Sequence, residues 1–244
     1  MIVAMVGKAR AGKTTLAALV ARWYARDYGS VRLVDACADR LLARTFGVRE
    51  LARDADEGEI AAAAGADESP ARALKIHGLD ALELAIDADG NVEADTPRGK
   101  VPPAELAIVD LPHDAPTTLL DLVDLVLLVC EPDPMSLESW QAWHDAAAAQ
   151  PDRILVVGNR VRDKYDVHLL RARTSEQLFT CYAFSELVQK ARSPKLLDLD
   201  QLEFGNQEVL AIVTRFLRRR CLASDDKVIS VSGAFGESPL GYGA

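Results

Sequence analysis

Continuous apolar runs, each about the length of a buried strand, recur along the chain. They are Ile2–Val6, Val31–Ala36, Leu106–Asp110, Leu125–Cys130 and Ile154–Val157. Such runs are typical of parallel strands that are covered on both faces. Helical patterns stand between or after them, at Thr14–Arg26, about Met135–Ala149 and about Gln207–Arg220. Strands that alternate with helices predict an α/β fold, with a doubly wound, mainly parallel sheet flanked by helices.

Two stretches depart from this alternation. The segment at about 48–103 is rich in Ala, Asp and Glu, and we interpret it as an elaboration between the second and third core strands. Within it, Asp89-Gly90 stands between short apolar runs and predicts a hairpin. The last residues, 224–244, are rich in Gly and Ser and are expected to form a loosely docked tail.

Residues 7–15 form the motif that bears most directly on function. They read G-K-A-R-A-G-K-T-T, which matches the phosphate-binding pattern G-x-x-x-x-G-K-[ST] and stands between a predicted strand and a predicted helix. Gly7 and Gly12 let the backbone curl so that successive N–H groups converge on a phosphate. Lys13 and the helix N-terminus add positive charge, and the Thr14 hydroxyl can ligate Mg²⁺. Residues 1–223 are therefore expected to form a single P-loop NTPase domain.

Composition and charge limit the kinds of partner and the location that the protein can have. The 244 residues are 49% hydrophobic and carry a net charge of −9, so a full core is possible and sequence-independent DNA binding is disfavoured. No apolar run approaches the ~20 residues of a membrane span, and the chain opens directly into a strand without a basic leader. We expect a cytoplasmic protein. The cysteines and histidines are scattered singly, so their spacing predicts no metal-binding motif.

The loop and three later segments carry a family resemblance. Lys8, one residue after the first glycine, resembles the signature lysine of the deviant loop K-G-G-x-G-K-T-T of the MinD/ParA ATPase superfamily. The later segments are similar to that superfamily's ATPases of the CooC type, which assist nickel insertion into carbon monoxide dehydrogenase. They are Val34-Asp35-Ala36 with Asp39 and Thr45-Phe46-Gly47-Val48, Val129-Cys130-Glu131-Pro132 with Ser136-Leu137-Glu138, and Val157-Gly158-Asn159-Arg160-Val161-Arg162.

The resemblance implies ATP and Mg²⁺ as cofactors and assigns roles to individual residues. Lys13, Lys8 and Asp110 would be the catalytic residues, with Lys8 reaching the triphosphate of a facing subunit. Thr14 and Asp110 would hold Mg²⁺. Asn159 would offer its amide to adenine. The loop residues that would cradle the phosphates are Gly7, Lys8, Ala11, Gly12, Lys13, Thr14 and Thr15.

One departure concerns the reaction. The second aspartate of V-D-x-D, which activates the attacking water in the family, is replaced here by Cys37. A thiol with an ordinary pKa of about 8.5 is a poor base at neutral pH. We therefore expect slow hydrolysis. Asp35 and Asp39 lack the expected spacing for a replacement base, and His113 in the loop after the third core strand is a further, weaker candidate.

Other departures concern assembly and metal handling. Ala9 and Arg10 replace paired glycines, so Arg10 either blocks the close approach of a second subunit in a homodimer or reaches a phosphate itself. Both alternatives remain open. Residues 38–129 contain no cysteine, so nickel handling through the C-x-C motif of the relatives is not supported.

These observations favour an ATP-binding, nucleotide-gated switch that acts on a protein partner or client enzyme, in metalloenzyme maturation or a related assembly task. The alternative is a degenerate, non-hydrolysing interaction protein that keeps the fold. Retention of Lys13, Thr14 and Asp110 favours the switch, since nothing structural requires that trio. A DNA-partitioning ATPase is a third possibility, which the charge of −9 weakens.

Overall fold

A computed structural model describes residues 1–46, 48, 71, 74, 79–89, 92–94, 104–174, 178–190 and 198–229. Within these residues, eight strands form one sheet in the order β4-β3-β2-β5-β1-β6-β7-β8. The bounds are β1 (Ile2–Val6), β2 (Val31–Asp35), β3 (Leu82–Ile86), β4 (Val92–Ala94), β5 (Ala107–Asp110), β6 (Leu125–Cys130), β7 (Ile154–Val161) and β8 (Leu178–Ala183). The pairs β2–β3 and β3–β4 are antiparallel, and all other neighbours are parallel.

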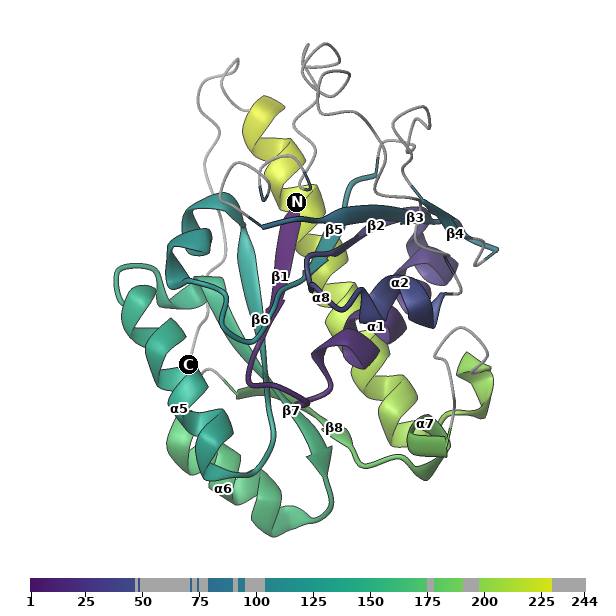
Figure 1. Cartoon of the computed structure of the whole chain (residues 1–244). Coiled ribbons are helices and arrows are strands. Elements are labelled where there is room, and N and C mark those ends of the chain that lie inside the picture. Colours follow the sequence, from purple (N-terminus) through teal and green to yellow (C-terminus); the bar gives the residue numbers. More distant parts are fainter. Residues whose placement is uncertain are drawn as a thin grey trace, which may run out of the picture.

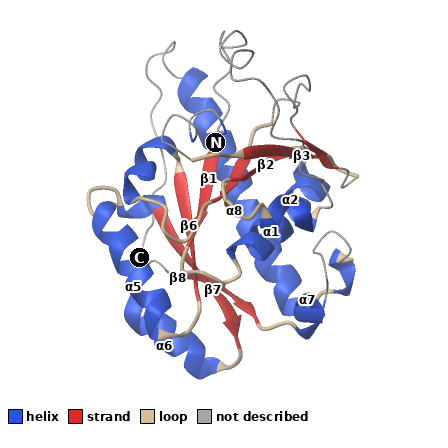
Figure 2. Ribbon diagram, viewed as in Figure 1, coloured by secondary structure: helices blue, strands red, loops and turns tan. Residues whose placement is uncertain are grey.

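Helices cover both faces of the sheet (Figures 1 and 2). Helices α1 (Lys13–Tyr28) and α8 (Phe204–Ile229) pack against one face together with α7 (Glu186–Lys190), while α5 (Pro134–Ala146) and α6 (Lys164–Thr174) cover the other. The short helix α2 (Leu41–Thr45) follows β2. Three short 3-10 segments, η1 (Thr117–Leu122), η2 (Pro151–Arg153) and η5 (Leu199–Gln201), complete the described helices. Side chains alternate along β1, so that Val3 and Met5 join one buried cluster and Ala4 and Val6 the other.

The predicted architecture is confirmed. All five predicted strands and all three predicted helices are present, although α8 extends beyond its predicted bounds at both ends and β7 runs to Val161 rather than Val157. The predicted hairpin is present as β3 and β4, which pair from Leu84 opposite Ala94 to Ile86 opposite Val92. The sequence analysis missed β8, in which polar and apolar residues mix and most side chains are only half buried. It also missed α6, whose outward face is polar.

The two departing segments are described only in part. Strands β3 and β4 add an antiparallel edge to the sheet, and most other residues of the segment at about 48–103 lie outside the described residues. Helix α8 extends to Ile229, and residues 230–244 also lie outside the described part of the chain. No helix in the described ranges is long and apolar enough to cross a membrane.

The joint between β2 and the antiparallel edge contains an ion pair that is almost fully buried. Arg32 Nη1 on β2 lies 3.1 Å from Glu83 Oε1 on β3, and the two side chains are 12% and 2% exposed. A buried ion pair adds little net stability over apolar residues of the same size, but removing one partner leaves the other charge uncompensated.

We expect Glu83→Ala to lower the free energy of unfolding by about 3 kcal/mol, because the Arg32 guanidinium then stays buried without its carboxylate. Urea denaturation followed by circular dichroism measures this change. The double variant Arg32→Met with Glu83→Leu removes both charges and should lose clearly less stability. Equal losses for the single and the double variant would contradict this account of the pair.

Candidate nucleotide-binding site

The loop between β1 and α1 follows a path that two glycines make possible. Gly7 has φ +140°, and a Cβ there would lie 2.4 Å from the Val129 carbonyl oxygen on β6. Gly12 has φ +87°, and its Cβ would lie 2.4 Å from Asn159 Nδ2 on β7. Any side chain at either position collides with a neighbouring strand and also strains the backbone. Arg10, with φ +63°, adopts the left-handed region without being glycine.

Strand β7 supports the loop through two side-chain hydrogen bonds. The buried Asn159 donates from Nδ2 to the Ala11 carbonyl oxygen at 2.6 Å, and Arg160 donates from Nη1 to the Arg10 carbonyl oxygen at 3.1 Å. The sequence analysis assigned the Asn159 amide to the adenine ring, and in the structure its N–H group is already used by the loop. Because the Asn159 side chain also lines the adjacent cavity, contact with a base stays a prediction.

Lys13 lies within the loop and is 7% exposed. Its ammonium donates to the Lys8 carbonyl oxygen at 3.0 Å. Burial lowers the pKa of Lys13, and the negative charge of Asp110 acts in the opposite direction. A buried ammonium at the N-terminus of a helix is well placed to receive a multiply charged anion.

Thr14 and Asp110 meet where the ends of β1 and β5 lie side by side. The Thr14 hydroxyl donates to Asp110 Oδ2 at 2.6 Å, and Asp110 is 0% exposed. The other carboxylate oxygen, Oδ1, is buried and has no hydrogen-bond partner among the described residues. Burial raises the pKa of Asp110 to about 7, which the Thr14 hydrogen bond and the Lys13 charge partly oppose. A buried carboxylate oxygen without a partner, beside a hydroxyl on a phosphate loop, fits the oxygen ligands that Mg²⁺ requires.

Cys37 lies beside Asp110. Its Sγ is 3.8 Å from the Asp110 carbonyl oxygen, and its N–H donates to Asp35 Oδ1 at 3.1 Å. Burial raises the pKa of Cys37 far above its usual value, and the charges of Asp110 and Asp35 raise it further. The side chain is therefore a neutral thiol at physiological pH and is not a base for water.

The three alternative bases lie in different settings. Asp35 is fully buried and accepts backbone N–H groups on both oxygens, from Cys37 and from Ala43 at 2.9 Å, so its carboxylate is occupied by local structure. Asp39 is exposed and its carboxylate lies 3.4 Å from the Leu41 nitrogen. His113 is exposed in the loop after β5 and, within the described chain, forms no hydrogen bond with residues 7–15. None of the three is in hydrogen-bond contact with the phosphate loop.

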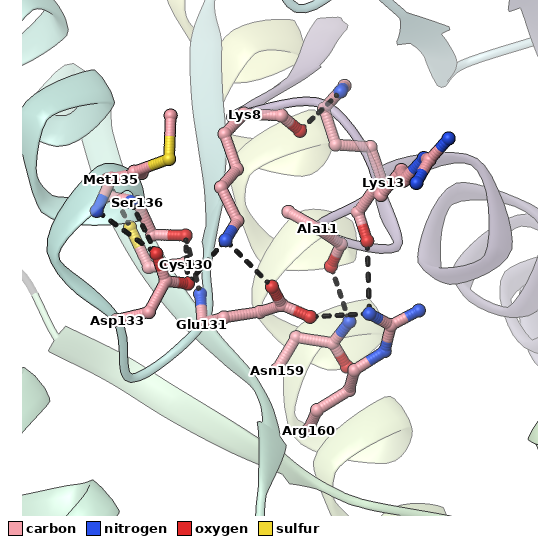
Figure 3. Close-up of polar contacts among 11 residues, drawn as sticks. Lys8, Ala11, Lys13, Cys130, Glu131, Asp133, Met135, Ser136, Asn159 and Arg160 are labelled. Carbon is pink, nitrogen blue, oxygen red and sulfur yellow. Dashed lines mark hydrogen bonds and ion pairs between the residues drawn. The ribbon is translucent and has the colours of Figure 1, made fainter.

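Lys8 points toward the beginning of α5 and is held by two acidic residues (Figure 3). Its Nζ lies 3.1 Å from Glu131 Oε2 and 2.5 Å from Asp133 Oδ2. Burial lowers the pKa of Lys8, but the hydrogen bonds to both carboxylates outweigh that effect and raise it. The role predicted for Lys8, contact with the triphosphate of a facing subunit, requires these ion pairs to open.

The same acidic residues connect the loop to other elements. Glu131 Oε1 accepts a hydrogen bond from Arg160 at 2.5 Å, and Asp133 caps α5 by accepting from Met135 N at 3.0 Å and Ser136 N at 3.2 Å. The sequence analysis quoted Glu131 only as part of a motif and missed its pairing with Lys8. The available signal was Asp133-Pro134, a typical helix start that follows Glu131 and the end of β6 closely, so that two carboxylates stand near the end of this strand.

A cavity of about 460 Å³ opens beside the beginning of α1. Its lining includes Gly12, Thr15, Leu16, Asn159, Tyr182 and Phe184. The volume is within the range of small-molecule sites, and two aromatic rings line it together with many polar side chains, Arg160 and Arg162 among them. The cavity adjoins the loop at Gly12 and Thr15. A nucleotide with its phosphates in the loop would therefore have its base next to this cavity.

Comparisons with known proteins identify the fold. No protein-family model and no curated protein sequence matches the chain. Among solved structures, a putative plasmid partition protein from Borrelia burgdorferi B31, bound to AMPPNP, has a TM-score of 0.58 at 15% identity and covers 89% of this chain and 98% of its own. The MinC:MinD cell division protein complex from Aquifex aeolicus gives a TM-score of 0.60 at 17% identity, and the match covers 89% of this chain and 95% of that one. MinD of Aquifex aeolicus alone gives 0.58 at 16% identity, with 89% and 96% covered.

The fold is therefore that of the MinD/ParA-type P-loop ATPases, as the resemblance implied. The similarity extends over most of this chain and nearly the whole of each neighbour. At these identities it shows the fold alone, and the finer resemblance to CooC-type ATPases stays a prediction.

The burial of the Asp110 carboxylate leads to a prediction about stability in the protein without nucleotide or metal. The raised pKa of this group means that ionisation costs stability, and this cost grows as the pH rises from about 4 toward 7. In protein free of nucleotide and metal, we expect Asp110→Asn to raise the free energy of unfolding at pH 7.5 by about 1–3 kcal/mol. Urea denaturation at pH 7.5 and pH 5 measures the effect, which should shrink at the lower pH.

The control for this experiment is Asp114→Asn, a substitution of an exposed carboxylate in the loop that follows β5. It should change stability by less than about 0.5 kcal/mol at either pH. An Asp110→Asn variant that is no more stable than the parent at pH 7.5 would contradict the assignment of a strained, partly ionised carboxylate to this position.

Proposed function

We propose that the chain binds MgATP, with the triphosphate in the loop at residues 7–15 and the base in the adjoining cavity. The observation that carries this proposal is the Thr14–Asp110 hydrogen bond at 2.6 Å, which lies beside the buried Lys13 and leaves Asp110 Oδ1 without a partner. A structural role alone gives no reason to bury both a carboxylate and an ammonium at the end of a central strand.

In this proposal the residues of the loop bind the phosphates. Backbone N–H groups of the loop would donate to phosphate oxygens, and Lys13 would donate to them once it leaves the Lys8 carbonyl oxygen. Thr14 and Asp110 would hold Mg²⁺, directly or through water, and the ion would neutralise charge on the phosphate oxygens. Asn159 keeps the loop in shape through Ala11, and Thr15 lies at the junction of loop and cavity.

We further propose that hydrolysis is slow. The Cys37 sulfur lies 3.8 Å from the Asp110 carbonyl oxygen, and the raised pKa of this thiol prevents it from taking a proton from water. Asp35 is occupied by two backbone N–H groups and does not replace it. Bound nucleotide, rather than rapid turnover, would then carry the signal.

The proposed role is a nucleotide-gated switch that engages a protein partner or client enzyme. The loops after β2 and β5 both border the expected γ-phosphate position, so ATP and ADP states would differ there. The MinD neighbour was solved in a complex with MinC, which supports a protein partner for this fold. The segments that resemble CooC-type ATPases favour a client in metalloenzyme maturation and a cytoplasmic location. The two alternatives for Arg10 belong to the same proposal: its side chain either blocks the close approach of a second copy or reaches a phosphate itself.

The first test is nucleotide affinity. By isothermal titration calorimetry we expect one MgATP per chain, and we expect Lys13→Ala to weaken binding at least tenfold, or about 1.4 kcal/mol. The matched control is Lys164→Ala, which removes an exposed lysine on α6 and should leave the affinity unchanged. A parent protein that binds no MgATP would overturn the proposal.

The second test is hydrolysis. We expect Cys37→Asp to raise the steady-state rate of phosphate release by about 10²-fold, because it restores a carboxylate where water is activated. Cys37→Ser serves as the control, since it is similar in size to cysteine and adds no base. An Asp variant that binds MgATP yet hydrolyses it no faster than the parent would favour the alternative, a non-hydrolysing interaction protein.

A further inference from the structure

We infer that Asp35, Cys37 and Asp110 form a binding site for a thiophilic divalent cation such as Zn²⁺, next to the phosphate loop. One ligand atom from each residue, two carboxylate oxygens and the Cys37 sulfur, lies within 4.8 Å of the other two. This is the one such group of metal-ligating side chains among the residues that the structure describes. None of the three ligands belongs to the phosphate loop, but Asp110 is shared with the proposed Mg²⁺ position, so the inference is tested in protein free of nucleotide.

An unused buried oxygen points independently to a missing ligand. Asp110 is 0% exposed, and its Oδ1 has no hydrogen-bond partner in the described chain. Leaving such an atom unsatisfied costs free energy, more for a charged group, and a bound cation would remove that cost. Asp110 Oδ2 meanwhile remains with the Thr14 hydroxyl, so the cation and the loop use different oxygens of one carboxylate.

The other two ligands are already oriented by the backbone. The Asp35 carboxylate is held by the N–H groups of Cys37 and Ala43 at 3.1 and 2.9 Å, and each oxygen keeps a lone pair for a metal. The same bond from the Cys37 N–H fixes that residue relative to Asp35. The sulfur makes only a weak 3.8 Å contact with the Asp110 carbonyl oxygen, which a metal bond would easily replace.

The donor set selects against Mg²⁺ and in favour of a softer ion. Mg²⁺ takes oxygen ligands almost exclusively, whereas a thiolate with carboxylates suits Zn²⁺ and its spectroscopic substitute Co²⁺. Bonds of about 2.3 Å to sulfur and 2.0–2.2 Å to oxygen require the cluster to contract slightly and leave a fourth position for water. Nearby cations oppose binding. They are the Lys13 ammonium, whose charge acts on Cys37 and Asp110, and Arg40, which donates to the Asp35 carbonyl oxygen. Three anionic ligands outweigh them.

Binding has a defined proton balance. The Cys37 thiol loses its proton as the sulfur–metal bond forms, so one proton is released to solvent for each ion bound, in addition to any carried by the carboxylates. No oxidant or reductant takes part.

Cobalt titration of the full chain, free of nucleotide, tests the inference. We expect Co²⁺ to produce a thiolate-to-metal charge-transfer band in the near ultraviolet that saturates at one ion per chain. Stoichiometric Zn²⁺ should abolish the band, and a large excess of Mg²⁺ should not. Cys37→Ser should remove the band, and Asp110→Asn should weaken Co²⁺ binding at least tenfold.

Cys181→Ser is the matched control, since it removes another half-buried cysteine, on β8. It should leave the band unchanged. Circular dichroism and urea denaturation confirm that each variant is folded, and any unfolded variant is replaced by Cys37→Ala or Asp110→Ala. Absence of a band in the parent, its persistence in a folded Cys37 variant, or its loss in Cys181→Ser would overturn the inference.

Discussion

The site depends on placing one carboxylate, that of Asp110, in a fully buried position at the end of a central strand. Strand β5 pairs with β1 so that Asp110 lies opposite Met5, two residues before the loop begins. The Thr14 hydroxyl on the first turn of α1 then closes onto the carboxylate. Strand, loop and helix are thus joined by a group that is costly to bury, and a bound cation would offset that cost. Burial raises the pKa of Cys37 and lowers that of Lys13, and the charge of Asp110 acts on both groups as well.

A second feature is that two cationic side chains at the loop, Lys8 and Arg160, pair with carboxylates of the same chain. Lys8 pairs with Glu131 and Asp133, and Arg160 shares Glu131 while supporting the Arg10 carbonyl oxygen. These contacts link the phosphate loop to the end of β6, the end of β7 and the beginning of α5. In the isolated chain, Lys8, which the family resemblance directs to the triphosphate of a facing subunit, is therefore engaged internally. Any partner that uses Lys8 competes with two carboxylates already in contact with it.

The fold was predictable because its signals are local. Long apolar runs marked the five central parallel strands, and Asp89-Gly90 marked the hairpin of β3 and β4. Strand β8 was missed because an edge strand with half-buried side chains lacks that signal. The site was predictable only in part. The glycines and Lys13 follow from the motif, whereas the pairing of Lys8 with Glu131 depends on β6 lying next to β1, more than a hundred residues later in the chain. The use of the Asn159 amide by Ala11 likewise depends on how closely β7 approaches the loop.

The central place of β1 also has a consequence for how the protein folds. The first strand of the chain pairs with β5 and β6, and the pairs Met5–Asp110 and Ala4–Val126 join residues about a hundred or more positions apart. Contacts so distant in sequence form slowly, because the entropy of closing a large loop opposes them until several strands assemble together. During synthesis, the motif at residues 7–15 is made before β5, β6 and β7, the strands that hold it in place. The phosphate loop is therefore made well before the parts of the chain that give it its shape.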